Sequence, residues 1–292
     1  MTVVAIQILV NGLIAGSLYA LVACGLSLLY NVEKFTNFAH GATVVISAYA
    51  TYFFSDIIKL PFVLAALLGI IIAVASAVVV DMAVFKTQRK RKFSMGIMLV
   101  TSLAILIFVS NLILLLFESK TFEFALSKSA TVYDNGLFRI TGVQVIMLFM
   151  AISLLVLFWL LMKKTKLGKA MRATADNRDV AQIVGINAEQ VYLFTTIIAA
   201  CTAGIAGILF ALDTNLFPTM GTNIMATTFA AAVIGGYNSV PGAVLGSFFI
   251  GIVENIVGWY LPTGYRTAIV FGIVFLFLIF RPRGLVGKVY ER

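Results

Sequence analysis

"NGLIAGSLYALVACGLSLLY" (residues 11–30) is twenty residues long and contains no charged side chain. A helix needs about 20 consecutive apolar residues to cross the hydrocarbon core of a bilayer, so this stretch predicts a membrane span. The apolar run covers residues 3–30, longer than one straight crossing requires, and holds Asn11 and Gly12 near its middle. We therefore expect a kink or a tilt. The N-terminus lacks a positively charged region and an A-x-A cleavage site, so we expect this span to be retained.

The composition extends this interpretation to the whole chain. Of its 292 residues, 61% are hydrophobic and 11% are charged, and the mean hydropathy is +1.05. A soluble domain carries about 25% charged residues, so an ordinary soluble protein is excluded. Strands of a membrane barrel would alternate polar and apolar residues, whereas these runs do not, so we expect helices. The apolar runs are 3–30, 38–58, 61–85, 94–117, 139–162, 190–211, 226–237, 240–260 and 265–281.

The expected fold is therefore an all-α integral membrane protein made of a single domain, residues 1–292. We expect eight or nine membrane-crossing helices. The count depends on the stretch 226–260, because "GGYNSVPGA" (235–243) interrupts it with residues that break helices. Non-helical backbone at membrane depth persists only where protein or a water-filled cavity surrounds it, so we expect one of these around the break.

Clusters of basic residues set the expected topology. The net charge is +9, and the clusters are "KTQRKRK" (86–92), "KKTKLGKAMR" (163–172) and "RPRG" (281–284). A nucleic-acid-binding protein would carry such patches on a soluble domain, and the sequence shows none. Basic loops stay on the cytoplasmic side of a membrane. We therefore expect all three clusters and the C-terminus in the cytoplasm, and residues 118–138 and the N-terminus outside.

A weak internal repeat accompanies two further helix breaks. "LVNGLIAGSLYALVACGLSLLY" (9–30) precedes a break at Asn37–Gly41, and "TIIAACTAGIAGILFAL" (196–212) precedes one at Pro218–Gly221. On the expected topology the first segment runs inward and the second outward. This is the pattern of inverted-repeat transporters, whose interrupted helices meet near the membrane midplane. Chance similarity between segments rich in small residues is the alternative.

Polar residues inside the apolar runs are the candidates for a pore or a helix break. His40 is the only histidine, and it either anchors the start of the second span by hydrogen bonding or lines a cytoplasmic exit. Glu254 is the only acidic residue deep in an apolar run, so we expect it to face protein or water beside Asn255. The candidates are Asn37, His40, Gly41, Gly235, Gly236, Asn238 and Glu254.

Two packing predictions follow from smaller patterns. Asp81 lies near the cytoplasmic end of its span, where it can pair with Lys86. Two G-x-x-x-G pairs allow close approach of helices, and we interpret them as structural. They are Gly12/Gly16 and Gly242/Gly246.

The sequence gives no support for catalysis or cofactor binding by this chain. A G-x-x-x-x-G-K-[ST] phosphate loop is absent, as are HExxH, CxxC and GxSxG. A single histidine does not make a metal site or an acid–base pair. Cys24 and Cys201 lie in apolar runs without metal-ligand spacing, so we interpret them as packing residues.

Residues 163–190 form the most informative polar stretch. Apolar residues recur there at helical spacing and include Met171, which predicts a first short amphipathic helix. Asp176 or Asn177 can cap a second short helix, and Gly185 suits the position after its end. Asn187, with Gln190 three residues later, is typical of the start of the next span. These helices either rest on the membrane surface or dock into a partner protein.

The chain resembles the permeases of bacterial branched-chain amino acid ABC transporters, a family that also includes urea and short-chain amide permeases. The resemblance rests on the stretch from Asn11 through "NFAHG" (37–41), "GKAMRATADNRDVAQIVGIN" (168–187) and "FAAAVIGGYNSVPGAVLGSFFIGIVE" (229–254), and extends to the C-terminal "RPRGLVG". The chain departs from the family at Asn238, where the family usually has glycine.

The resemblance implies that residues 163–190 couple the permease to an ATPase subunit, through Gly168, Arg172, Ala173 and Gly185. We also expect Met171, an apolar residue of this stretch, on the exposed docking surface. It implies a homologous second permease subunit, two ATP-binding subunits that hold the ATP and Mg, and an extracytoplasmic substrate-binding protein. The expected function is ATP-driven import of branched-chain or hydrophobic amino acids by alternating access across a bacterial or archaeal inner membrane. The alternatives are an ABC permease for urea or short amides, and a stand-alone channel or secondary carrier.

Overall fold

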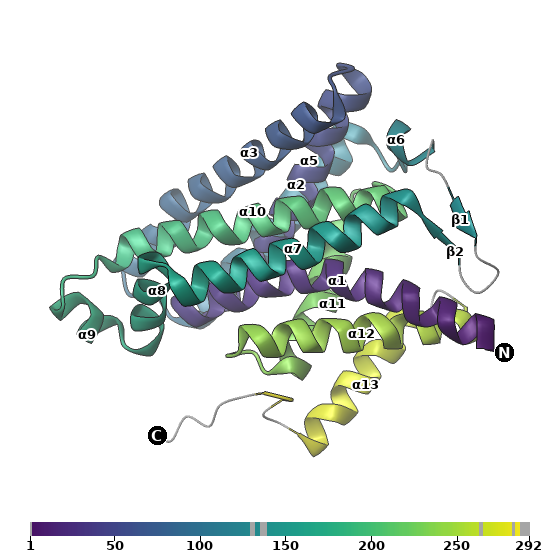
Figure 1. Cartoon of the computed structure of the whole chain (residues 1–292). Coiled ribbons are helices and arrows are strands. Elements are labelled where there is room, and N and C mark those ends of the chain that lie inside the picture. The colour runs from purple at the N-terminus through teal and green to yellow at the C-terminus, as the bar shows by residue number, and fades with distance from the viewer. Residues whose placement is uncertain (1, 129–131, 135–138, 263–264, 282–283, 287–292) are drawn as a thin grey trace.

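The structure is a computed structural model that describes residues 2–128, 132–134, 139–262, 265–281 and 284–286 (Figure 1). Part of the predicted outer loop 118–138 and of the basic cluster 281–284, together with residues 287–292, lies outside the described residues. A two-stranded antiparallel hairpin pairs β1 (Val132–Asp134) with β2 (Arg139–Thr141). The helices are α1 (Thr2–Glu33), α2 (His40–Tyr52), α3 (Phe62–Val80), α4 (Lys86–Lys90), α5 (Met95–Phe117), α6 (Ala125–Lys128), α7 (Gly142–Lys164), α8 (Lys166–Asp176), α9 (Arg178–Ile183), α10 (Ala188–Thr214), α11 (Met220–Gly235), α12 (Val240–Tyr260) and α13 (Arg266–Phe280), with π-helical turns at Phe53–Ile57 and Asp81–Phe85.

The prediction of an all-α membrane architecture is confirmed. Within the described part of the chain, six helices are long and apolar enough to cross a membrane. They are α1, α3 with its extension to Lys90, α5, α7, α10 and α12. A count of eight or nine crossings therefore also needs shorter helices such as α2, α11 and α13. The helical pair α8 and α9 lies at one end of the molecule, and the hairpin and the N-terminus lie at the other (Figure 1).

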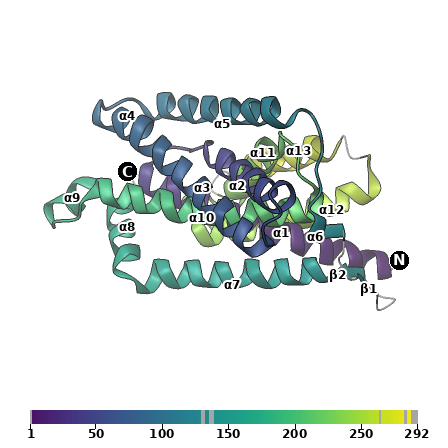
Figure 2. The same cartoon turned by 90° about the horizontal axis from the view of Figure 1, so that it is seen from above.

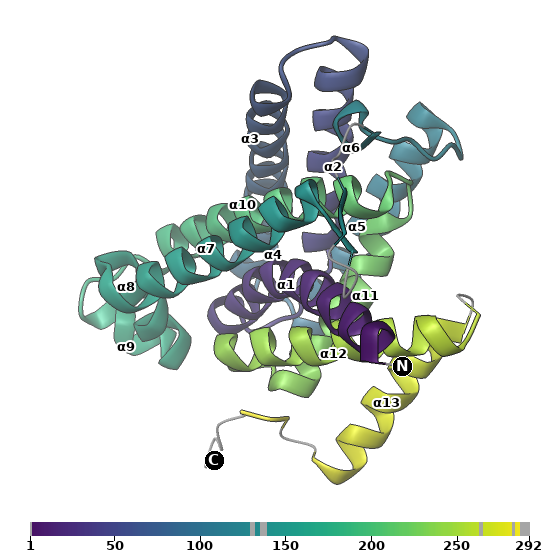
Figure 3. The same cartoon turned by 45° about the vertical axis from the view of Figure 1, so that its right-hand side comes forward.

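Helix α1 is the centre of the bundle. In its most apolar window 89% of residues are buried, against 17% for α3 and for α7. Helices α5 and α7 flank the bundle on opposite sides (Figure 2), and α2 and α3 project from it as a pair (Figure 3). Large apolar side chains remain exposed on α3, α5 and α7, as expected for surfaces that lipid covers. Helix α1 continues through Asn11 and Gly12, so the expected irregularity there does not interrupt it.

Glycines allow α1 to pack closely against α12, as predicted. A Cβ at Gly12 would lie 2.8 Å from the Cα of Ile252, and one at Gly16 would lie 2.8 Å from the Cα of Phe248. Such separations are too short for real side-chain contacts, so only glycine fits at these positions.

Two helices begin in the interior of the bundle, at the breaks that were predicted. After α1 ends, the chain turns back so that His40, at the start of α2, lies beside Val22 and Gly25 of α1. Helix α11 begins after α10 in a similar way, and a Cβ at Gly41 would lie 2.9 Å from the carbonyl oxygen of Gly221. The starts of α2 and α11 therefore meet inside the protein.

The break between α11 and α12 is also confirmed. Helix α11 ends at Gly235, and Gly236 takes the left-handed backbone with φ of 104°. Asn238, where the family usually has glycine, is exposed and does not adopt a left-handed backbone. Ser239 then caps α12 by accepting a hydrogen bond from the backbone N–H of Gly242.

The close contact between α1 and α12 predicts a position-specific effect of added volume. We expect Gly16→Val to destabilise the protein by about 1–3 kcal/mol, because the side chain must push the helices apart. Gly272→Val in α13 is the matched control, because a Cβ there meets no atom within 4 Å. Thermal unfolding in detergent measures both variants. Equal midpoints for the two would contradict the packing argument.

Candidate functional site

Local capping residues define the helices α8 and α9 at one end of the bundle. Thr165, Asn177 and Asn187 each accept a hydrogen bond from backbone N–H groups in the first turn of the helix that follows. Gly185 takes the left-handed backbone with φ of 88°, as predicted for the end of α9. Of the two predicted caps, Asn177 is the one used, and Asp176 is the last residue of α8. The two short helices are therefore confirmed.

Helix α8 is fixed against the end of α7. A Cβ at Gly168 would collide with the carbonyl oxygen of Met162, and Arg172 donates a hydrogen bond to the same oxygen. Met171 is fully buried in a cluster of apolar side chains, so its predicted place on an exposed docking surface is wrong. Ala173 is half-buried. Gly168 and Arg172 hold α8 in position, and of these two residues Arg172 is also exposed.

The exposed apolar surface lies on α9 and the turn that follows it. Val180, Ile183 and Val184 are 55%, 83% and 68% exposed, whereas Ala181 is buried. Ile183 was missed in the sequence because the rotation of a six-residue helix is not fixed by its own periodicity. We call Val180, Ile183 and Val184 the α9 patch.

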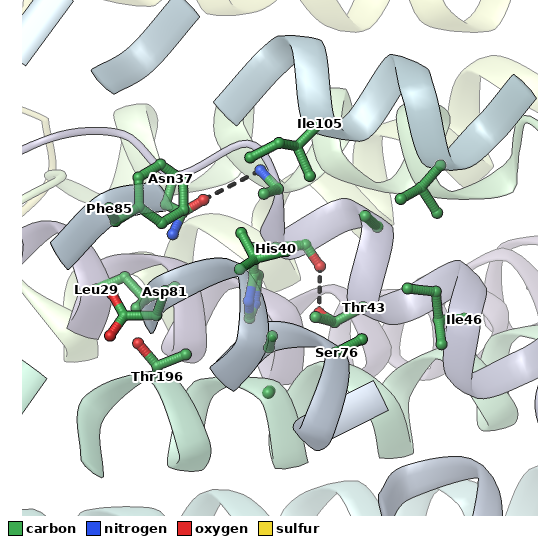
Figure 4. Close-up of a pocket in the computed structure, with 16 residues that line it drawn as sticks. Leu29, Asn37, His40, Thr43, Ile46, Ser76, Asp81, Phe85, Ile105 and Thr196 are labelled. Carbon is green, nitrogen blue, oxygen red and sulfur yellow. Dashed lines mark hydrogen bonds between the residues drawn. The ribbon is translucent and has the colours of Figure 1, made fainter. Parts of the chain in front are cut away.

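A cavity of about 100 Å³ lies among α1, α2, α3, α5 and α10 (Figure 4). About 10–15 Å³ of such volume holds one water molecule, so the cavity can hold several. Ten of its sixteen lining residues are apolar. The polar ones are Asn37, His40, Thr43, Ser76, Asp81 and Thr196.

Two of the predicted residues at the start of α2, Asn37 and His40, make hydrogen bonds and line the cavity, and a cytoplasmic exit there stays a prediction. The Nε2 of His40 donates to the backbone oxygen of Val22 at 3.2 Å, and the ring also lines the cavity. Asn37 accepts a hydrogen bond from the backbone N–H of Ala39 at 3.1 Å. Gly41 permits the contact with α11. His40 is therefore an anchor for the helix start that also faces the cavity.

Asp81 forms a different ion pair from the predicted one with Lys86. Both of its oxygens accept from the guanidinium of Arg89, at 2.7 and 3.2 Å. A planar guanidinium can make two parallel hydrogen bonds to a carboxylate, which a lysine cannot. The sequence carried no signal for this choice, because a π-helical turn at Asp81–Phe85 alters the helical phase between the two residues.

Glu254 faces protein, as predicted, but its hydrogen-bond partner lies far away in the sequence. The hydroxyl of Tyr19 in α1 donates to Glu254 Oε2 at 2.7 Å. The expected neighbour Asn255 instead donates to the carbonyl oxygen of Gly251 within its own helix. The carboxylate therefore links α12 to the central helix.

Buried interrupted helices, a mostly apolar interior cavity and a capped helical pair at one end are the features of a multi-pass helical membrane permease. Residues 8–279 match the protein family described as branched-chain amino acid transport system / permease component, and the chain belongs to this family. It is 30% identical to the probable branched-chain amino acid transport permease protein LivH of Methanocaldococcus jannaschii, over 98% of this chain and 94% of the relative. It is 28% identical to BraD, a high-affinity branched-chain amino acid transport system permease protein of Pseudomonas aeruginosa, over 97% of this chain and 96% of the relative.

Two other similarities are more limited. A 105-residue match, covering 34% of this chain at 32% identity, is to the autoinducer 2 import system permease protein LsrC of Escherichia coli. The fold is similar to a chain of the solved structure of PsaBC from Streptococcus pneumoniae in complex with Fab. The TM-score is 0.50 at 13% identity, and the similarity covers 94% of this chain and 91% of the other. At that identity the likeness concerns the fold alone.

The Tyr19–Glu254 hydrogen bond predicts an order among substitutions. We expect Glu254→Gln to be tolerated better than Glu254→Leu, because the amide oxygen still accepts from Tyr19. Leucine leaves the buried hydroxyl without this acceptor, at a cost of about 1–3 kcal/mol. The yield of folded protein and its unfolding temperature in detergent measure the difference, with Tyr19→Phe in the Glu254→Leu background as the control. Equal stability of the Gln and Leu variants would show that the hydrogen bond is dispensable.

Proposed function

We propose that this chain is the membrane-spanning subunit of an ATP-driven ABC importer for branched-chain or other hydrophobic amino acids. The observation that carries the proposal is the α9 patch, apolar surface exposed on a helix that is fixed by caps at one end of the bundle. A helix that rested on lipid would need only an amphipathic face, whereas this one continues into an ionic contact with the bundle. The names of the full-length relatives support the cargo class.

The proposed assembly contains a homologous second permease subunit, two ATP-binding subunits and an extracytoplasmic substrate-binding protein. ATP and Mg bind to the ATP-binding subunits, and this chain performs no covalent chemistry. Gly168, Arg172, Ala173 and Gly185 act by fixing α8 and α9, and the α9 patch makes the contact. Alternating access then follows from movement of α9 against the bundle.

We further propose nine crossings in the cytoplasmic (inner) membrane, with the N-terminus outside, the C-terminus inside and residues 163–190 in the cytoplasm. In addition to the six long helices, the shorter helices α2, α11 and α13 would each cross the membrane. Each of the three is preceded or followed by non-helical chain. The matching geometry of α1 with α2 and of α10 with α11 supports an inverted repeat. The break glycines Gly235 and Gly236 would then stay inside the bundle.

Two alternatives make different predictions. The apolar majority of the cavity lining favours an aliphatic cargo over urea or a short amide, which would need more hydrogen-bonding groups. A stand-alone channel or secondary carrier would give flux in liposomes without ATPase subunits. The exposed α9 patch argues against this second alternative, because such a protein needs no docking surface there.

A charge in the α9 patch tests the proposed docking. We expect Ile183→Asp to weaken association with the ATPase subunits by about tenfold or more, as for a residue at the centre of an interface. The expected matched control is Val132→Asp, the same kind of change at an exposed residue (61%) of the hairpin at the opposite end. Pull-down of the ATPase subunits and transport in proteoliposomes measure the effect. Full association and transport by Ile183→Asp would overturn the docking assignment.

Thiol labelling tests the proposed orientation. In a background with both native cysteines replaced by alanine, we expect an impermeant maleimide to label Tyr133→Cys in intact cells. Gln182→Cys should react only after permeabilisation. Both positions are exposed, so access from one side of the membrane decides the outcome. Labelling of Gln182→Cys in intact cells would reverse the orientation.

A further inference from the structure

A chain of ionic contacts runs from α9 into the interior of the protein. The guanidinium of Arg178 in α9 lies 3.7 Å from Glu189 Oε1 at the start of α10. The other oxygen of Glu189 lies 3.5 Å from Arg89, which holds Asp81 in the two hydrogen bonds described above. We call Arg178, Glu189, Arg89 and Asp81 the ion chain.

One aromatic ring packs against both cations of the ion chain. The guanidinium carbon of Arg89 lies 4.6 Å from the ring centroid of Tyr192, and that of Arg178 lies 5.4 Å from it. These distances suit cation–π contacts. Because Tyr192 is one turn of α10 beyond Glu189, the same helix contacts both arginines through two side chains.

The inner end of the ion chain reaches two hollows. Asp81 lines the interior cavity (Figure 4) and also a shallower pocket, which includes Lys86, Glu189 and Gln190. Helix α9 and the cavity are therefore connected by charged groups that touch one another in series.

Burial increases steadily along the ion chain. The side chains of Arg178 and Glu189 are 44% and 31% exposed, whereas those of Arg89 and Asp81 are 5% and 4% exposed. Exposed ion pairs contribute little stability, whereas breaking a buried pair leaves an uncompensated charge. A displacement of α9 would thus break the outer contact first and leave the inner pair intact.

Two buried polar atoms lack hydrogen-bond partners in the described part of the chain, one in Arg89 of the ion chain and one in Glu33 at the end of α1. Arg89 Nε and Glu33 Oε2 are buried and have no hydrogen-bond partner among the described residues. The other oxygen of Glu33 receives only a long hydrogen bond, 3.5 Å, from Thr196, which lines the cavity. An unsatisfied buried group favours any rearrangement that supplies a partner. A rearrangement of this cluster could therefore supply the missing partners, which is what a relay through it would use.

We propose that Glu189 is a positioning residue, which transmits the position of α9 through Arg89 and Asp81 to the interior cavity. This inference rests on the proposed function, in which α9 is the part of the chain that an ATPase subunit moves. Glu189 touches neither cargo nor nucleotide. It sets the position of Arg89, and through that pair it sets the accessibility of the cavity.

A thiol in the cavity reports the relay without any cargo. Ser76 lines the cavity and is half-buried, so Ser76→Cys in a Cys24→Ala/Cys201→Ala background can react with a small methanethiosulfonate. We expect Arg178→Gln and Glu189→Gln each to change the labelling rate of the purified chain about two- to tenfold. Arg178→Lys keeps the charge and should stay close to the parent. Lys169→Gln removes the same charge from an exposed residue of α8 and should also leave the rate unchanged.

Two further measurements distinguish failure of this proposal from failure of the proposed function on which it rests. The double variant Arg178→Gln/Glu189→Gln should be no more affected than Glu189→Gln alone, because Glu189→Gln already removes the contact with Arg178. An unchanged rate in both single variants, equal effects of Arg178→Lys and Arg178→Gln, or additive effects in the double variant would each overturn the relay. ATPase association should persist in Arg178→Gln, and its loss would make Arg178 a docking residue. Failure of the docking assignment is read separately, from Ile183→Asp, because the labelling assay needs no partner.

Discussion

The architecture depends on the requirement that every backbone polar group at membrane depth finds a partner inside the protein. A continuous helix meets this requirement alone, whereas each interruption needs help from elsewhere. The N–H of Phe38, before α2, donates to the hydroxyl of Ser102 in α5. After α10, Leu216 exchanges two backbone hydrogen bonds with Phe122 in the connection that follows α5. Hydrogen bonds from α5 and its flanking chain thus satisfy backbone groups at these two interruptions.

Local features of this fold could be predicted from the sequence, because their causes are local. The breaks at 37–41, 218–221 and 235–243 follow from Gly, Pro and Asn in apolar runs, and each separates two helices in the structure. The caps at Asn177 and Asn187 need only the backbone next to them. Apolar length and composition in turn identified the class of protein.

Features that depend on how helices rotate against one another could not be predicted. Met171 lies on an amphipathic helix, and only the packing of α8 against α1, α7 and α10 decides that it faces inward. The partner of Glu254 is Tyr19, at the opposite end of the sequence. The choice of Arg89 over Lys86 depends on a π-helical turn that no residue pattern announced. In a chain this uniformly apolar, periodicity distinguishes inside from outside poorly, so the candidate site emerged only with the packing.

The chain that follows α13 supplies hydrogen bonds to the break between α11 and α12. The N–H groups of Leu285 and Val286 donate to the backbone oxygens of Ile234 and Gly235, at 2.8 and 3.0 Å. The two oxygens at the end of α11 therefore gain these partners only when the chain that follows α13 folds back onto the break. The segment after α13 is thus part of this break, although α12 and α13 separate the two in the sequence.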